Sequence, residues 1–325
     1  MGDGAPLPEI RVTEDCNYIA AFLTLACPYR CEYCINSFET PERSARGDGR
    51  LLRGAEWARG LSRLTNLERE EGLVPVTLQG GEPSVHPDFY DVINALPERI
   101  RLDVLTNLAF DVEEMIARVR PERLRREAPY ASIRVSYHPG QVPFEDLLAK
   151  VHRLQEAGFD VGIWAVEHPA VSEHVRAAQR RALGEGIDFR LKEFLGYYQG
   201  RLHGQYKYAG ACALGRRRRV WCRTTELIVG PEGSVYRCHR CLYEGGEPIG
   251  HILDAAFRMD GAWRACDWYG HCNPCDVKVK TNRLQQFGHT AVEIRPWTGE
   301  QREEEPGRTG EKKTGSVAGA GARGV

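Results

Sequence analysis

Short apolar runs alternate with segments of helical periodicity through the first two thirds of the chain. Six runs predict strands, at residues 18–25, 74–78, 102–105, 132–136, 161–166 and 189–194. Five segments predict helices between them, at residues 54–71, 88–96, 112–119, 144–156 and 172–183. Repeated β/α steps of this kind predict an α/β fold with a parallel sheet under helices. The pattern leaves open whether the sheet is doubly wound or a partial barrel.

The pattern changes after about residue 200, where Cys, Gly, Arg and aromatic residues dominate. A hairpin is predicted here, with strands at 226–229 and 234–237 around a Gly-Pro-Glu-Gly turn. We expect a bound metal to help hold this short stretch together, since it cannot bury much apolar surface alone. The last 28 residues contain no aromatic side chain and predict disorder. The predicted segments are an N-terminal arm (1–14), an α/β domain (15–200), a Cys-rich domain (201–297) and a disordered tail (298–325).

The composition excludes some partners. The chain has 325 residues, 44 of them basic and 45 acidic, so its net charge of −1 does not favour nucleic acid or anionic lipid. The N-terminus lacks the basic-then-apolar order of a signal peptide, and the uncharged run at 16–29 is too short to cross a bilayer. We therefore expect a cytoplasmic protein without a membrane partner, in which cysteines serve metals more often than disulfides.

The 11 cysteines form two groups, four at residues 16–34 and seven at 212–275, and three of the first four lie directly after the first predicted strand. There Cys27, Cys31 and Cys34 are separated by three and then two residues, at the edge where parallel α/β folds place their active sites. Three thiolates can bind three irons of a four-iron cluster and leave the fourth iron open to a small molecule. A zinc loop is the alternative, although a structural zinc site needs four protein ligands.

Two motifs give this region a family resemblance. The Cys27, Cys31 and Cys34 spacing, with Tyr33 before the third cysteine, resembles the CxxxCxxC motif of radical S-adenosylmethionine (SAM) enzymes. The run Gly80, Gly81, Glu82, Pro83 at the next strand end resembles the GGEP motif of that family. The resemblance implies a partial (β/α)6 TIM-like barrel, a [4Fe–4S] cluster on the three cysteines, and SAM bound beside Tyr33 and the four GGEP residues. It also implies an electron donor of the flavodoxin or ferredoxin type.

Later strand ends offer further candidates. Asn107 and Ser136 are predicted to contact SAM, and the alternative is that both only cap helices or turns. His138, Glu167 and Lys192 are the candidate catalytic residues on the same edge.

The second group contains seven cysteines between residues 212 and 275. Cys222, Gly233 and Cys238 have a spacing that resembles the SPASM/twitch extension of radical SAM enzymes, which implies a small twitch-like C-terminal domain with an auxiliary [4Fe–4S] cluster. The predicted ligands are Cys222, Cys238, Cys272 and Cys275, with Cys241 and Cys266 as alternatives. Two CxxC pairs, at 238/241 and 272/275, favour zinc as the competing metal. Cys16 and Cys212 have no assigned ligand role and are candidate hydrogen donors.

The predicted function is SAM cleavage to a 5′-deoxyadenosyl radical that abstracts hydrogen from a small polar metabolite, such as a sugar, sugar nucleotide or nucleoside. Antibiotic assembly is the favoured pathway, and the net reaction is left open between oxidation, epimerisation and carbon–carbon bond formation. A peptide-modifying maturase is the alternative. From another class, a non-catalytic zinc or iron–sulfur module would contact RNA or a protein, with the arginines at 216–219 and the basic run 278–283 as candidate contacts.

Overall fold

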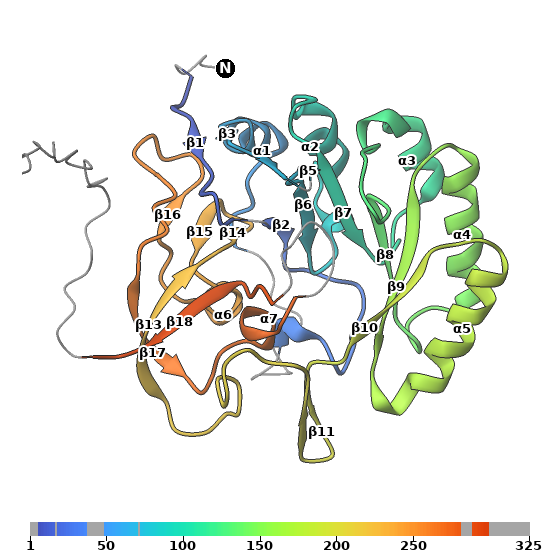
Figure 1. The fold of residues 1–325 in the computed structure, drawn as a ribbon. Helices are drawn as coiled ribbons and strands as arrows, with labels where there is room; N and C mark the ends of the chain where they lie inside the picture. Colours follow the sequence, from blue (N-terminus) through green and yellow to red (C-terminus); the bar gives the residue numbers. More distant parts are fainter. Residues whose placement is uncertain (1–5, 17, 38–48, 71, 281–287, 299–325) are drawn as a thin grey trace, which may run out of the picture.

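The computed structural model describes residues 6–16, 18–37, 49–70, 72–280 and 288–298 (Figure 1). Its main sheet has nine strands in the order β10-β9-β8-β7-β6-β2-β14-β15-β16. Six neighbours are parallel: β2 (Ile19–Thr24), β6 (Val76–Gly80), β7 (Leu102–Thr106), β8 (Ile133–Tyr137), β9 (Val161–Glu167) and β10 (Phe189–Glu193). These six follow one another in chain order, as in a TIM-type barrel, whereas a doubly wound sheet reverses direction. The partial barrel is therefore confirmed over the doubly wound alternative.

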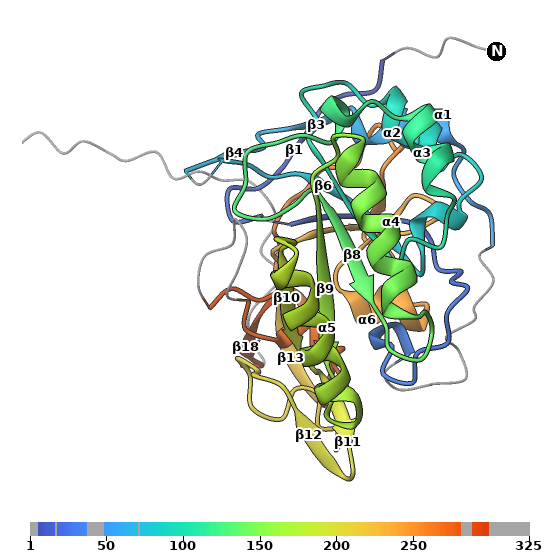
Figure 2. The ribbon, with the colours of Figure 1, turned by 90° about the vertical axis from the view of Figure 1, so that its right-hand side faces the viewer.

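Five helices lie along the outer side of this sheet (Figures 1 and 2). They are α1 (Gly54–Leu61), α2 (Phe89–Ala95), α3 (Val112–Arg118), α4 (Phe144–Glu156) and α5 (Ser172–Gly184). Short 3-10 turns follow three of the strands, η1 (Ile35–Ser37), η3 (Pro83–Val85) and η5 (Pro169–Val171), and η4 (Pro121–Arg123) follows α3. Four of the five predicted helices end within two residues of their predicted bounds.

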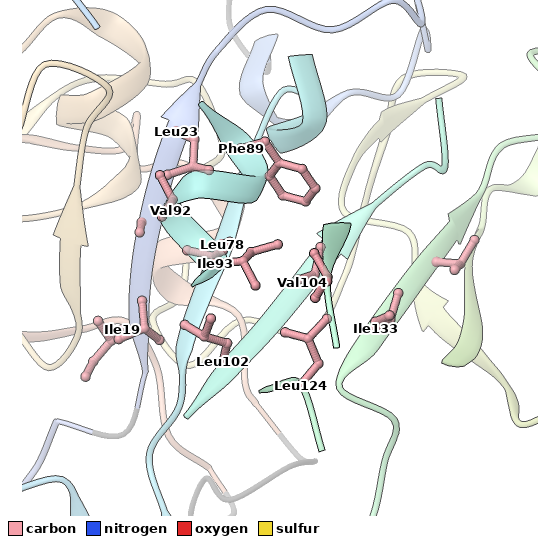
Figure 3. Packing of buried hydrophobic residues seen from close by; sticks show 14 of the residues in the cluster. Ile19, Leu23, Leu78, Phe89, Val92, Ile93, Leu102, Val104, Leu124 and Ile133 are labelled. Carbon is pink, nitrogen blue, oxygen red and sulfur yellow. The ribbon is translucent and has the colours of Figure 1, made fainter. Parts of the chain in front are cut away.

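The core fills the layer between helices and strands. Figure 3 shows Phe89, Val92 and Ile93 of α2 packed over apolar side chains of the strands. Because each such side chain contributes about 1.5–3 kcal/mol when fully buried, this layer supplies most of the stability of the barrel. The polar ends of the strands are left at one edge, where the site lies.

The predicted helix at 54–71 is wrong in its second half. After α1 the chain forms β3 (Leu64–Thr65), which pairs in parallel with β1 (Ile10–Arg11), and then the hairpin of β4 (Glu68–Arg69) and β5 (Gly72–Leu73). Arg63 explains the end of the helix, because its guanidinium donates to the carbonyl oxygens of Pro8 (2.6 Å) and Asp254 (2.9 Å). These partners are distant in sequence, so local periodicity cannot reveal them.

The predicted C-terminal hairpin is confirmed, but it belongs to the main sheet. β14 (Leu227–Val229) pairs in parallel with β2, and β15 (Ser234–Tyr236) and β16 (Gly250–His251) extend the sheet further. Leu227, Val229 and Val235 are part of the main apolar core. This corrects the expectation that the stretch buries little apolar surface.

The remaining C-terminal elements form a second layer beside the barrel. A three-stranded antiparallel sheet has the order β17-β13-β18, with β13 (Arg218–Thr224), β17 (Arg264–Tyr269) and β18 (Val292–Pro296). It is accompanied by α6 (His239–Glu244), α7 (Pro274–Val277) and the hairpin of β11 (Gly196–Tyr198) and β12 (Arg201–His203). Within the described ranges, no helix is both long and apolar enough for a membrane span. Residues 281–283 of the basic run and 299–325 of the predicted tail lie outside the described residues.

Candidate active site

The loop after β2 brings Cys27, Cys31 and Cys34 to the carboxyl edge of the barrel. The amide of Cys34 donates to the carbonyl oxygen of Cys31 (3.1 Å), and the amide of Ser37 donates to that of Cys34 (3.0 Å). All three cysteines line one cavity of about 210 Å³. Burial, followed by the charges of Cys34 and Cys27, raises the pKa of the Cys31 thiol to about 12. Three thiolates can share this buried space only with cations among them, which fits a cationic iron cluster.

A single metal ion is a different case. Within the described part of the chain, no three His, Cys, Asp or Glu side chains converge on one ion. Each thiolate of a four-iron cluster instead binds its own iron, so its ligands are spread more widely.

The two glycines of the GGEP motif are required by the cysteine loop. A Cβ at Gly80 would lie 2.0 Å from the carbonyl oxygen of Thr24, and one at Gly81 would lie 2.3 Å from that of Ala26. The amide of Gly81 donates to Thr24 O and that of Glu82 to Ala26 O, both at 2.9 Å. The end of β6 therefore packs directly against the start of the loop, so Gly80 and Gly81 hold the cysteines in place as well as lining the cavity.

Glu82 joins the same motif to the next strand. Its carboxylate, which is fully buried, accepts bonds from Ser84 Oγ (2.7 Å), Thr106 Oγ1 (2.7 Å) and the Asn107 amide (2.6 Å). Burial raises the pKa of this carboxyl although the hydrogen bonds oppose the shift. Pro83 is buried and begins η3. These two residues therefore position the strand ends, and a direct contact with SAM stays a prediction.

Asn107 and Ser136 both lie in the cavity with the cysteines. Nδ2 of Asn107 donates to Sγ of Cys27 over 3.6 Å, while its Oδ1 accepts from the Ala109 amide at 3.0 Å. Asn107 thus performs the turn-capping role and also faces the cavity. The half-buried Ser136, at the end of β8, lines the same wall.

Tyr33 lines the cavity and contacts two histidines. Its hydroxyl lies 3.2 Å from Nδ1 of His138, and its ring stacks on His138 and His168 with centroid distances of 5.9 and 5.3 Å. Burial, together with the charge of Lys192, lowers the pKa of His138 to about 4. His138 is therefore neutral near pH 7 and can exchange a hydrogen bond with Tyr33.

Glu167 contacts α5, and its predicted catalytic role stays a prediction. Its carboxylate pairs with Arg176 and accepts a hydrogen bond from Ser172 Oγ at 3.0 Å, both of which belong to α5. Its neighbour Val166 lines the cavity instead, because successive side chains of β9 point to opposite faces. Glu167 supports the barrel wall.

A second cavity of about 330 Å³ adjoins the first. The two share seven lining residues, among them Tyr33, Gln79 and Gly80, so they form one continuous space. The second cavity extends from the barrel, where Lys192 of β10 lines it, to α6 and α7, where Lys278 lines it. Of the three predicted catalytic residues, His138 lines the first cavity and Lys192 the second.

Five cysteines of the second group lie together around the three-stranded sheet. Cys266 pairs with Val220, two residues before Cys222, so Cys222 and Cys266 share one face of β13 and β17. Sγ of Cys238 and Sγ of Cys241 are 3.5 Å apart at the start of α6. Burial raises the pKa of Cys272, and Cys266 is among the charges that raise it further. The group is Cys222, Cys238, Cys241, Cys266 and Cys272.

Cys275 lies apart from this group, and the predicted ligand set that includes it stays a prediction. Asn273 caps α7 by accepting the Cys275 amide at 2.9 Å, and this turn directs Cys275 into the second cavity. Burial raises the pKa of its thiol to about 11, while the charge of Lys192 lowers this pKa and that of Cys34 in the first group raises it. Cys16 and Cys212 are both buried away from the two cavities. Cysteine spacing alone could not separate Cys275 from Cys272.

Comparisons with known proteins give the following similarities. Residues 22–174 match a family model described as the radical SAM superfamily. The PqqA peptide cyclase of Methylorubrum extorquens is 26% identical, and the match covers 81% of this chain and 78% of the relative. The PqqA peptide cyclase of Methylorubrum populi has the same identity and coverage. A solved structure described as native anSMEcpe with bound AdoMet has a TM-score of 0.48 and 13% identity, over 73% of this chain and 78% of that chain.

Proposed function

We propose that the chain is a radical SAM enzyme that modifies a peptide at the cavity beside Cys27, Cys31 and Cys34. The match of residues 22–174 to the radical SAM superfamily supports the reaction class. The observation that carries the proposal is the continuous space that begins at these thiols and extends into a second cavity. The sequence favoured a sugar or nucleoside substrate in antibiotic assembly. Relatives named peptide cyclases support the peptide alternative instead.

The three cysteines would hold the [4Fe–4S] cluster of the superfamily, and SAM would bind beside Gly80, Asn107 and Ser136. When bound, cluster and SAM supply a 5′-deoxyadenosyl radical that abstracts hydrogen from an unactivated carbon. The residues of the chain would hold the reacting groups in position and exclude water from them. Asn107 holds Cys27 by a hydrogen bond, and the buried strand ends keep water away.

The peptide would bind in the second cavity. A volume of about 330 Å³ is at the small end of ligand pockets, so it suits one or two side chains of a peptide that continues outside. Tyr243, Phe22 and Tyr18 give it apolar walls, while Lys192 and Lys278 give it positive charge. Cys275 faces this space and would be the thiol nearest the peptide.

We further propose an auxiliary iron–sulfur cluster bound by four of the five grouped cysteines, with Cys266 among the four because it lies beside Cys222. Burial raises the pKa of Cys222, and Cys266 and Cys272 raise it further, so these thiolates also need cations between them. Zinc would use the same donor atoms. Metal analysis of the anaerobically reconstituted protein distinguishes zinc from an iron–sulfur cluster.

The substrate class is tested by isotope transfer. Short peptides encoded beside the gene are synthesised with deuterated side chains and incubated anaerobically with enzyme, SAM and dithionite. We expect deuterium from one peptide to appear in 5′-deoxyadenosine by mass spectrometry. Transfer from labelled uridine or a labelled sugar nucleotide, with none from the peptides, would overturn the peptide proposal.

A further inference from the structure

Arginine and aromatic side chains interleave on the sheet of β13, β17 and β18. Five arginines each place their guanidinium carbon 3.5 to 5.5 Å from an aromatic ring centre. The pairs are Arg217 with Trp268, Arg218 with Tyr269, Arg219 with Trp297, and both Arg223 and Arg295 with Trp263. We call these five arginines the arginine face, although they come from both sides of the sheet: Arg218 lies on the side of β13 that carries Cys222, and Arg219 and Arg223 lie on the other. The stacking fixes their positions, so less freedom is lost when a partner binds.

The arginine face is locally basic on a chain that is almost neutral. Arg219 has Asp267 at 3.3 Å, and Arg223 has Asp15 at 2.8 Å. Arg217, Arg218 and Arg295 are exposed. The net charge of the whole chain is only −1, so this concentration of positive charge is a property of the sheet. Such a surface attracts an acidic partner and speeds its association.

A groove of about 310 Å³ lies within the arginine face. Its walls include Arg218, Arg219, Arg295, Trp297, Val220 and Tyr269. Val220 and Tyr269 are also members of the apolar cluster that contains Cys222, and Cys266 and Cys272 pack against that cluster. The groove is therefore in contact with the layer that holds the five grouped cysteines.

We propose that the arginine face docks an acidic electron-carrier protein. The inference rests on the proposed function, because reductive cleavage of each SAM needs one electron: the carrier is oxidised by one electron and the enzyme is reduced by one. Arginine and tryptophan are common anchors at protein interfaces, and a carrier seated here lies against the cysteine layer. Among the described residues, groove and second cavity share no lining residue, so docking leaves the peptide site open.

RNA or an acidic peptide would also be attracted by arginines. The contact between the groove and the cysteine layer favours the electron carrier, because electron exchange requires closeness to the metal centres whereas RNA binding does not. Binding of RNA or of an acidic peptide is a result that the test below can detect.

The test is binding of oxidised plant-type [2Fe–2S] ferredoxin and of flavodoxin to the reconstituted enzyme, by calorimetry at low and high salt. We expect at least one to bind, with affinity about tenfold weaker when salt rises from about 50 to about 300 mM. Arg218→Glu with Arg219→Glu should weaken binding by about tenfold or more, and the corresponding double change to Gln by less. The matched control changes the adjacent, exposed Arg180 and Arg181 of α5 to Glu and should bind as the wild type.

Formation of 5′-deoxyadenosine with dithionite, which needs no docking, should be unchanged in all variants and reports their folding. Loss of that activity in the wild type would contradict the proposed function alone. The docking proposal is overturned if neither carrier binds the wild type, if the Glu variant binds equally well, or if only polyuridylate or a polyglutamate peptide binds.

Discussion

Nδ2 of Asn107 donates a hydrogen bond to Sγ of Cys27 across 3.6 Å, which joins the end of β7 to the cysteine loop after β2. A hydrogen bond to a ligand sulfur stabilises the extra negative charge of a reduced cluster. We therefore predict that Asn107→Leu lowers the midpoint potential of the first cluster on the order of tens of millivolts. An anaerobic redox titration followed by electron paramagnetic resonance measures it. The bond to Glu82 uses the Asn107 backbone amide, so it is retained, and an unchanged potential would show that the sulfur contact is not made.

Gly81→Ala should displace the cysteine loop, since the new Cβ would lie 2.3 Å from Ala26 O and 2.4 Å from Leu25 O. We expect a loss of most of the iron bound by the first cysteine group after reconstitution. Gly184→Ala is the matched control, because nothing lies within 4 Å of its added Cβ. Equal iron content in both variants would contradict the close packing of β6 against the loop.

Glu82→Gln should destabilise the fold by about 1–3 kcal/mol, because an amide replaces one acceptor oxygen that is buried among donors. A backbone amide donates to each oxygen of this carboxylate, Asn107 to one and Ser84 to the other, so either orientation of the new amide places its NH2 against a backbone donor. Urea unfolding of the metal-free protein measures the difference. The exposed Glu114→Gln serves as the control, with an expected change below about 0.5 kcal/mol.

Cys266→Ser and Cys275→Ser distinguish the two possible ligand sets of the second group. The structure places Cys266 among the grouped cysteines and Cys275 in the second cavity. We expect Cys266→Ser to remove about four irons per chain and Cys275→Ser to leave the iron content unchanged. The reverse pattern would restore the set predicted from the sequence.

The barrel was predictable because its signals are local. Each parallel strand is an apolar run, and helices such as α4 repeat buried residues at helical spacing, with Leu147, Val151 and Leu154 on one face. The end of α1 was not predictable, because Arg63 is held by carbonyls on distant segments. For the same reason the hairpin at 227–236 was visible in the sequence, while its pairing with β2 was not.

In the candidate site, too, some features follow from local sequence and others depend on contacts with distant segments. Cys27, Cys31, Cys34 and the GGEP glycines could be identified because their spacing within two loops carries the pattern. The orientations of Glu167 and Cys275 depend on α5 and on the cap of α7, so spacing could not give them. No local pattern indicates that Arg217, Arg218 and Arg219 stack on aromatic rings distant in the sequence.

The most direct test of the radical SAM assignment is the formation of 5′-deoxyadenosine. The anaerobically reconstituted enzyme is incubated with SAM and dithionite, and the products are quantified by chromatography and mass spectrometry. We predict 5′-deoxyadenosine and methionine from the wild type, and neither from the variant in which Cys27, Cys31 and Cys34 are all changed to Ala. No 5′-deoxyadenosine from a wild type that holds its full iron content and binds SAM would contradict the account.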